Sequence, residues 1–149
     1  MPELFLRVNP NKEESKVDLK KEKPLLIVIA LGQNDYNLVF KRTTFPENYK
    51  NRKDEFIISY YADFLEDICA AYPEVPILWC LGSMDATSPG SKWPFYIEKA
   101  IELAKKRHPD RVFETLFFKW HGNRLHPNIK QHEKMAEILE EKIKNMMLW

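Results

Sequence analysis

The chain has 149 residues, and its 23 lysines and arginines nearly balance its 22 aspartates and glutamates, which leaves a formal net charge of +1 at pH 7. This length suits one domain with its own core, and the interleaved charges form no basic block of the kind that binds nucleic acid. The longest apolar run, residues 25–31, is too short to cross a bilayer, and the first residues show no secretory signal pattern. We therefore expect neither nucleic acid nor a membrane as a partner.

The first half of the chain predicts an arm, a strand, a connection and a helix. Residues 1–24 are polar and rich in lysine, which is typical of a loop or arm. Residues 25–31 are continuously apolar and end at Gly32, as in a parallel strand that is covered on both faces. Residues 36–53, rich in threonine, asparagine and lysine, predict a long connection, and the three-to-four spacing of apolar residues then predicts a helix over 54–71.

The second half continues the alternation of strand and helix. Residues 77–81 predict a buried strand, and the loop 83–93 leads into a helix over 94–108 whose first residue is proline. Residues 112–118 predict a third strand, nearer the edge of the sheet because it is less uniformly apolar, and a closing helix follows from 129 onward. This order predicts an α/β fold, with a parallel sheet between two helical layers.

Candidate catalytic residues follow the strands. Ligands of parallel sheets bind at the carboxyl ends of the strands, where Asn34, the 83–93 loop and the 121–126 loop all lie. The amide of Asn34 could donate a hydrogen bond to an oxyanion, and His126, held in an extended conformation by Pro127, could act as a general base. Two ordinary alternatives stay open: Asn34 could only shape a turn, and His126 could be a cap or surface histidine.

Other residues at this edge are weaker candidates. Trp93 could stack on a sugar ring, although a tryptophan near a strand end more often anchors its loop to the core, and Trp120 is weaker still. A metal site made of Asp35, His121 and His126 has little support because the usual zinc-ligand spacing is missing. We expect neither a metal nor a cofactor.

Two segments together resemble conserved blocks of the SGNH, or GDSL-type, hydrolases. They are Leu-Ile-Val-Ile-Ala-Leu-Gly-Gln-Asn-Asp at 26–35, which is similar to the third block, and His-Pro-Asn-Ile-Lys-Gln-His-Glu-Lys-Met-Ala at 126–136, which is similar to the fifth. Within this superfamily the chain looks most like carbohydrate esterase family 2, whose members remove acetyl groups from plant cell-wall polysaccharides. Residues 1–4, 81–84 and 148–149 carry this closer resemblance.

The resemblance implies a flavodoxin-like SGNH hydrolase fold whose N-terminal strands are missing. Residues 1–149 would form a partial hydrolase domain, with an arm over 1–24 and an α/β core over 25–149. It places Asn34 in the oxyanion hole and His126 as general base. The chain departs from the family because it has no Gly-Asp-Ser block with the nucleophilic serine and no second block with its oxyanion-hole glycine. Asn123-Arg124 also replaces the acid that often precedes the histidine.

The resemblance implies a secreted carbohydrate esterase that acts on acetylated polysaccharide such as xylan, here a fragment that lacks its nucleophile and is inactive alone. Ser83, Ser88 and Ser91 lie at the correct edge, but none sits on a tight strand-to-helix turn. The alternative is a non-catalytic carbohydrate-binding or scaffold domain of the same fold. An unrelated flavodoxin-like binding domain would need a phosphate loop, and none is visible. Without a preceding strand, residues 25–31 would form a bare edge through which the chain could self-associate.

Overall fold

The described residues form an α/β fold built on one parallel sheet. The computed structural model describes residues 5–41, 49, 51–122 and 126–148. Its strands are β1 (Ile27–Ile29), β2 (Ile77–Leu81) and β3 (Phe113–Phe117), hydrogen-bonded in the order β1-β2-β3. Leu78 of β2 is in register with Val28 on one side and Glu114 on the other. The predicted parallel sheet is confirmed, and the predicted strand over 77–81 has the observed bounds.

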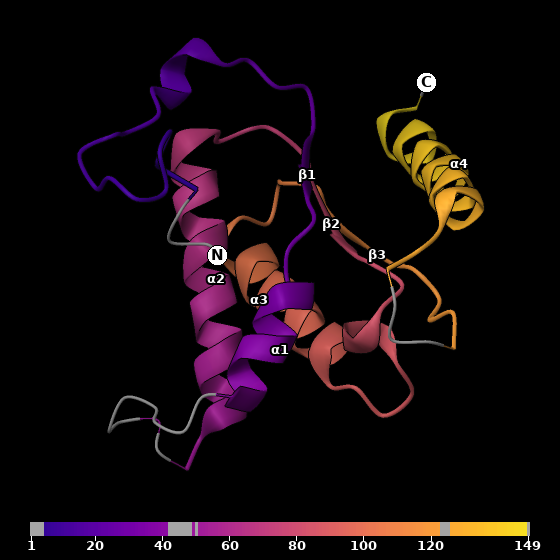
Figure 1. The fold of residues 1–149 in the computed structure, drawn as a ribbon. Helices are drawn as coiled ribbons and strands as arrows, with labels where there is room; N and C mark the ends of the chain where they lie inside the picture. Colours follow the sequence, from indigo (N-terminus) through magenta and orange to yellow (C-terminus); the bar gives the residue numbers. More distant parts are fainter. Residues whose placement is uncertain (1–4, 42–48, 50, 123–125, 149) are drawn as a thin grey trace.

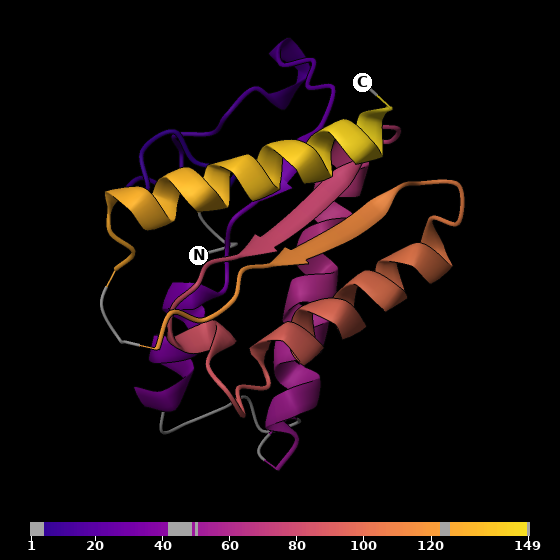
Figure 2. The same cartoon turned by 90° about the vertical axis from the view of Figure 1, so that its right-hand side faces the viewer.

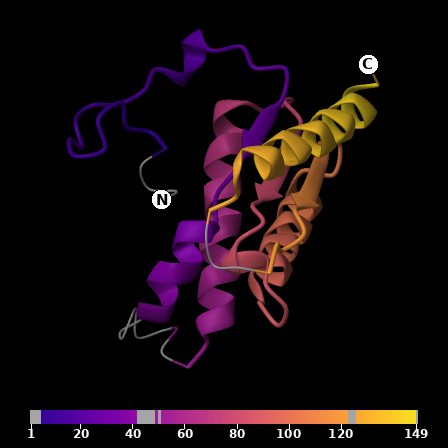
Figure 3. The ribbon, with the colours of Figure 1, turned by 45° about the vertical axis from the view of Figure 1, so that its right-hand side comes forward.

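Helices lie on both faces of this sheet. They are α1 (Gln33–Lys41), α2 (Lys53–Ala71), α3 (Trp93–Arg107) and α4 (Ile129–Met147), with short 3-10 turns η2 (Leu19–Lys21) and η4 (Asp85–Thr87). Helices α2 and α3 cover one face, and α4 crosses the other (Figures 1 and 2). The three layers are visible in Figure 3. No described helix combines the length and apolarity that a membrane span requires.

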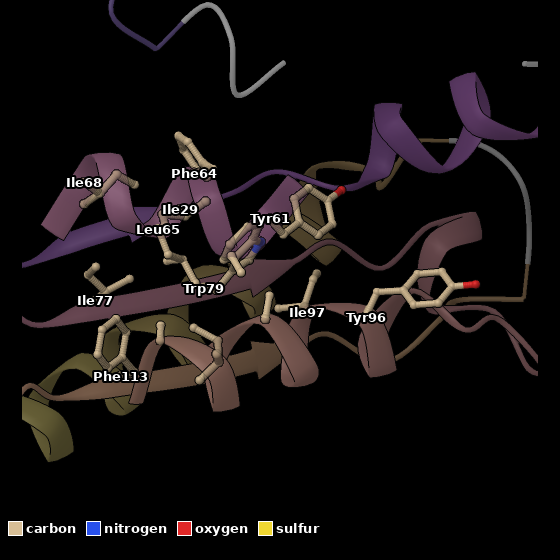
Figure 4. Close-up of a cluster of buried hydrophobic side chains, with 14 of the residues drawn as sticks. Ile29, Tyr61, Phe64, Leu65, Ile68, Ile77, Trp79, Tyr96, Ile97 and Phe113 are labelled. Atoms are coloured by element: carbon tan, nitrogen blue, oxygen red, sulfur yellow. The ribbon is translucent and has the colours of Figure 1, made fainter. Parts of the chain in front are cut away.

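The larger core lies between the sheet and the helices α2 and α3 (Figure 4). Trp79 of β2 is fully buried there, with its ring edge-on to Tyr61 of α2 at a centroid distance of 4.9 Å. The indole N–H of Trp79 donates a hydrogen bond of 2.9 Å to the carbonyl of Leu31, just after β1. This bond satisfies the polar group of a large buried ring and also holds the end of β1 in place.

The other face of the sheet is only partly covered. Helix α4 has no fully buried residue, and it packs its half-buried side chains, such as Met135 and Leu139, over Leu78 and Cys80 of β2. Val28 of β1 stays 42% exposed. The expectation that the first strand is covered on both faces is therefore wrong. Side chains alternate across a strand, so Ile29 enters the core while Val28 points to the face that α4 leaves open.

A second correction concerns the segment that follows β1. The expected long connection over residues 36–53 is wrong at its start, because α1 occupies Gln33–Lys41. The carboxylate of Asp35 in the first turn favours a helix N-terminus, and the ring of Tyr36 packs edge-on against Trp93 at 5.6 Å. Residues 42–48 and 50 of this segment lie outside the described residues.

The predicted arm has little regular structure over residues 5–24. An isolated antiparallel bridge joins Arg7 to Lys16, and η2 adds one short turn. Phe5 packs edge-on against Phe64 of α2, with ring centroids 5.7 Å apart, so the arm is anchored to the main core. Residues 1–4 and 149, which contribute to the family resemblance, lie outside the described part of the chain.

Candidate active site

The site begins at Gly32, where the chain turns from β1 into α1. Gly32 has a φ of +121°, a conformation that residues with a Cβ rarely adopt. A Cβ built there would lie 2.9 Å from Nε1 of Trp93 and 3.1 Å from Cδ1 of Leu81. Glycine is therefore required at this position for two reasons, its backbone angle and the space available. The tight turn places Asn34 in the first turn of α1, at the carboxyl end of β1.

A chain of hydrogen bonds ties this turn to the core. The Trp93 indole N–H donates to the hydroxyl oxygen of Tyr61 at 3.0 Å, and the Tyr61 hydroxyl donates to Oδ2 of Asp35 at 3.2 Å. Burial, reinforced by the Asp35 carboxylate, raises the pKa of Tyr61 well above its ordinary value. The hydroxyl therefore keeps its proton and stays a donor to Asp35. Because Asp35 follows Asn34 directly, the network orients the first turn of α1.

A second contact joins α1 to the loop after β2. When the Gln33 side-chain amide is oriented to fit its hydrogen-bonding surroundings, its oxygen accepts from the backbone N–H groups of Asp85 and Ala86, each at 3.1 Å. The 83–93 loop thereby docks on the start of α1. The residue before Asn34 and the residue after it are both held by tertiary contacts.

The predicted oxyanion donor, Asn34, has no hydrogen-bond partner among the described residues. Its side chain is exposed. Asn34 belongs to the first turn of α1. An amide in the first turn of a helix, with N–H groups that have no partner among the described residues, is a suitable donor to an oxygen that becomes negative during acyl transfer.

The predicted base lies just before α4. His126 is exposed, and its ring makes no hydrogen bond or ion pair within the described ranges. Two residues later, Asn128 caps α4: its Oδ1 accepts from the N–H of Gln131 at 3.0 Å, and its own N–H donates to Oε1 of Gln131 at 2.8 Å. The cap gives the segment that carries His126 a defined end. No hydrogen bond joins Asn34 to His126, and Asn123, the expected substitute for the acid, lies outside the described residues.

The serines of the chain are engaged elsewhere. Ser83 is 1% exposed, and its hydroxyl faces Sδ of Met135 at 3.3 Å. Ser88 and Ser91 donate to the carbonyls of Asp85 and Ala86, each at 2.7 Å, and so shape their own loop. The remaining two hydroxyls, of Ser15 and Ser59, also have hydrogen-bond partners. The structure therefore gives no support to a loop serine as the nucleophile.

The structure places the tryptophans of this edge and shows whether the described residues could hold a metal ion. Trp93 is 3% exposed, and its indole is committed to Tyr61, so it offers no ring face to a sugar and acts instead as the anchor of its loop. The Nε1 atom of Trp120 is buried and has no hydrogen-bond partner among the described residues. Within the same residues, no cluster of three or more histidine, cysteine or acidic side chains is arranged to hold a metal ion.

Comparisons with known proteins identify the fold. No family model matches the chain. Over 138 residues, 89% of the chain, it is 27% identical to the cellulase/esterase CelE of Acetivibrio thermocellus. The structure superposes on the acetyl xylan esterase Est2A of the rumen bacterium Butyrivibrio proteoclasticus with a TM-score of 0.79 at 21% identity, covering all of this chain and 46% of the esterase. The fold is that of the family 2 carbohydrate esterases.

Further family 2 esterases agree with this identification. An enzyme from Cellvibrio japonicus superposes with a TM-score of 0.73 at 20% identity. One from Clostridium thermocellum, solved in complex with cellohexaose, gives 0.72 at 24% identity, covering 99% of this chain and 43% of the esterase. The chain thus spans less than half of each of these esterases and 16% of CelE. The resemblance carried by residues 26–35 and 126–136 is confirmed.

Sequence reasoning missed the residues that support the site. Tyr61 belongs to the apolar stripe of a predicted helix. Nothing in that spacing distinguishes a tyrosine whose hydroxyl bonds to Asp35 from an ordinary core tyrosine. The sequence does not reveal the contact of Gln33 either, because its partners in the η4 turn lie about fifty positions away. The one available signal was Gly32, since a glycine between an apolar strand and polar residues often marks a required turn.

Proposed function

We propose that this chain supplies the oxyanion donor and the general base of a carbohydrate esterase that acts on acetylated plant cell-wall polysaccharide such as xylan. The observation that carries the proposal is the turn at Gly32, which holds Asn34 at the carboxyl edge of the sheet with no hydrogen-bond partner for its amide among the described residues. His126 follows β3 and so belongs to the same edge by topology. The fold shared with family 2 esterases, one of them an acetyl xylan esterase, supports the same assignment.

In the proposed reaction a serine hydroxyl attacks the carbonyl carbon of the acetyl ester, and the imidazole of His126 accepts the hydroxyl proton. The Asn34 amide donates a hydrogen bond to the oxyanion of the tetrahedral intermediate. When the C–O bond to the sugar breaks, His126 returns the proton to the leaving sugar oxygen. Water then attacks the acetyl-serine by the same route, which releases acetate and restores the serine.

The nucleophile in this scheme comes from outside the 149 residues. None of the chain's serine hydroxyls is hydrogen-bonded to His126, and the three loop serines are held by Met135 or by backbone carbonyls. We therefore expect the 149 residues alone, a partial hydrolase domain, to be inactive. An enzyme with a polysaccharide substrate would act outside the cell.

A chimera tests this proposal. In the chimera, residues 1–149 replace the segment of the Butyrivibrio acetyl xylan esterase on which they superpose, so that the esterase supplies the serine. Release of acetate from acetylated xylan is then measured. Asn34→Ala should lower kcat about 10²–10³-fold, and His126→Ala should lower it about 10²–10⁴-fold.

Matched controls exist within the chain. Asn37 lies one turn after Asn34 on α1, and His132 is exposed on α4. Asn37→Ala and His132→Ala should leave kcat within about twofold, since neither residue belongs to the proposed machinery. If the control and test variants lower kcat equally, the assignment is contradicted. A folded chimera that binds acetylated xylan without releasing acetate would favour the non-catalytic alternative, for which the engaged serines are the supporting observation.

A further inference from the structure

A groove of about 520 Å³ lies between the end of β3 and the first half of α4. Asn128, two positions after His126, lines it, so the groove adjoins the candidate active site. It lies on the β3 side of the sheet, away from the edge strand β1. The reaction proposed above uses none of its residues.

The rim of this groove is cationic and unpaired. Lys119, Lys130 and Lys134 line it, all three are exposed, and none makes an ion pair or hydrogen bond with a described residue. Lys130 and Lys134 lie one turn apart on α4, so their side chains project from the same side of the helix. No acidic residue is among the described residues that line the groove.

Some other lysines of the described chain, in contrast, form ion pairs. Lys92 lies 2.8 Å from Oδ2 of Asp54, and Lys142 lies 2.8 Å from Oε2 of Glu114. The rim lysines have no such counter-charge, so their mutual repulsion would be relieved by an anionic ligand.

The side-chain amides of Asn128 and Gln131 in the groove also have N–H groups without a partner among the described residues. The capping pair at the start of α4 uses Oδ1 of Asn128 and Oε1 of Gln131 as acceptors. The NH₂ groups of both side chains have no hydrogen-bond partner among the described residues. Ammonium groups donate only, so the polar lining offers donors for which a carboxylate or another oxyanion is the matching acceptor.

Apart from His121, which is exposed, the remaining lining is apolar. Phe118 is buried in the smaller core, Met135 is half-buried beside it, and Ile138 is 40% exposed. Met135 and Ile138 could pack against the C–H face of a pyranose ring while the lysines contact its charged group. A small inorganic anion would leave the apolar side chains without a partner, whereas an acidic sugar uses both parts of the lining.

We propose that this groove binds a uronic acid unit of an acidic polysaccharide, with the sugar ring on Met135 and Ile138 and its carboxylate among Lys119, Lys130 and Lys134. That the ligand is a glycan rests on the proposed function, while the preference for negative charge rests on the groove alone. The groove would select acetylated polysaccharides that carry uronic acid branches, and would hold such a branch next to His126.

Binding of defined oligosaccharides to the full chain tests this inference, with no hydrolysis required. Isothermal titration calorimetry compares a xylo-oligosaccharide that carries one glucuronic acid branch with the same unbranched oligosaccharide. The branched ligand should bind about tenfold more tightly at low salt, and 0.5 M NaCl should remove most of this preference. Lys130→Ala/Lys134→Ala should abolish the preference without changing binding of the neutral ligand.

The control is a second exposed lysine pair with the same charge. Lys105 and Lys106, in the last turn of α3, do not line the groove, and Lys105→Ala/Lys106→Ala removes the same two charges. If both double variants lose the preference for the branched ligand equally, the effect of charge is general and the inference is overturned. Binding of sulfate or a nucleotide as tight as that of the branched sugar would also overturn it. If the neutral ligand binds and the uronate gives no advantage, the inference fails while the proposed function stands. If no oligosaccharide binds but free glucuronate does, the groove binds uronate as inferred, and the result contradicts the proposed function.

Discussion

Tyr61 and Asp35 are joined by a hydrogen bond of 3.2 Å between the phenol hydroxyl and Oδ2 of the carboxylate, although they lie 26 positions apart. The same hydroxyl accepts the indole N–H of Trp93 at 3.0 Å. One buried oxygen therefore connects α2, α3 and the first turn of α1. This connection makes the orientation of Asn34 a property of the core rather than of a surface loop.

Removing this hydroxyl should weaken the fold measurably. Tyr61→Phe leaves the indole N–H of Trp93 buried without its acceptor, at a cost of about 1–3 kcal/mol in the free energy of unfolding. Urea denaturation followed by circular dichroism measures this cost. Tyr72→Phe is the control, because the Tyr72 hydroxyl makes no hydrogen bond within the described chain. A Tyr61→Phe variant as stable as the control would contradict the role of the network.

A side chain at Gly32 should be harmful for two separable reasons. Gly32→Ala combines an unfavourable φ of +121° with a Cβ 2.9 Å from Trp93, whereas Gly90→Ala has φ of +82° and nothing within 4 Å. Backbone strain costs roughly 1–3 kcal/mol at either position. Gly32→Ala should cost more than Gly90→Ala, and the difference in unfolding free energy measures the clash. Equal losses would mean that Trp93 moves aside freely.

The contact between α2 and α3 should weaken in acid. Hydrogen bonds from Lys92 and Tyr96, at 2.8 and 2.6 Å, lower the pKa of Asp54 below its ordinary value of 3.8. A carboxyl whose pKa is depressed in the folded state stabilises the fold above its unfolded pKa, and this contribution is lost as the pH falls through the folded value. Asp54→Asn should therefore reduce the fall in Tm between pH 5 and about pH 2.

The control for this pH dependence lies on the same helix. Asp63 is exposed on α2 and has no ion pair within the described residues. Asp63→Asn should leave the acid-induced fall in Tm close to that of the unmodified chain. If Asp54→Asn and Asp63→Asn have the same pH profile, the hydrogen bonds to Lys92 and Tyr96 do not stabilise the ionised carboxylate.

We expect the isolated chain to self-associate through β1. In the described sheet, β1 pairs with β2 alone, and Val28 and Leu25 are 42% and 70% exposed beside its open edge. Analytical ultracentrifugation should detect concentration-dependent association, and Val28→Lys should weaken it about tenfold because a charge on an edge strand opposes pairing. Val112→Lys, at a valine that is 47% exposed next to β3, should leave the association unchanged. A strict monomer at all concentrations would refute this expectation.

Local patterns predicted the central elements because burial imposes a period on the sequence. Residues 77–81 are apolar without interruption since both faces of β2 are covered, and this run coincides with the observed strand. The helix expected over 54–71 begins at Lys53, and the one expected over 94–108 ends at Arg107. The family blocks at 26–35 and 126–136 also predicted the esterase fold correctly.

The sequence by itself therefore determined the order of the three strands and of helices α2, α3 and α4, and the position of Asn34 just after the first strand. It did not reveal that Asn34 belongs to a helix, because α1 is supported by Trp93 and by the η4 turn, which are distant along the chain. Only the tertiary structure decided that Trp93 anchors its loop instead of facing a sugar. It also brought to one groove three lysines that have no ion pair within the described part of the chain. Periodicity reports which side chains are buried, whereas hydrogen-bond partners across long separations depend on how the layers pack.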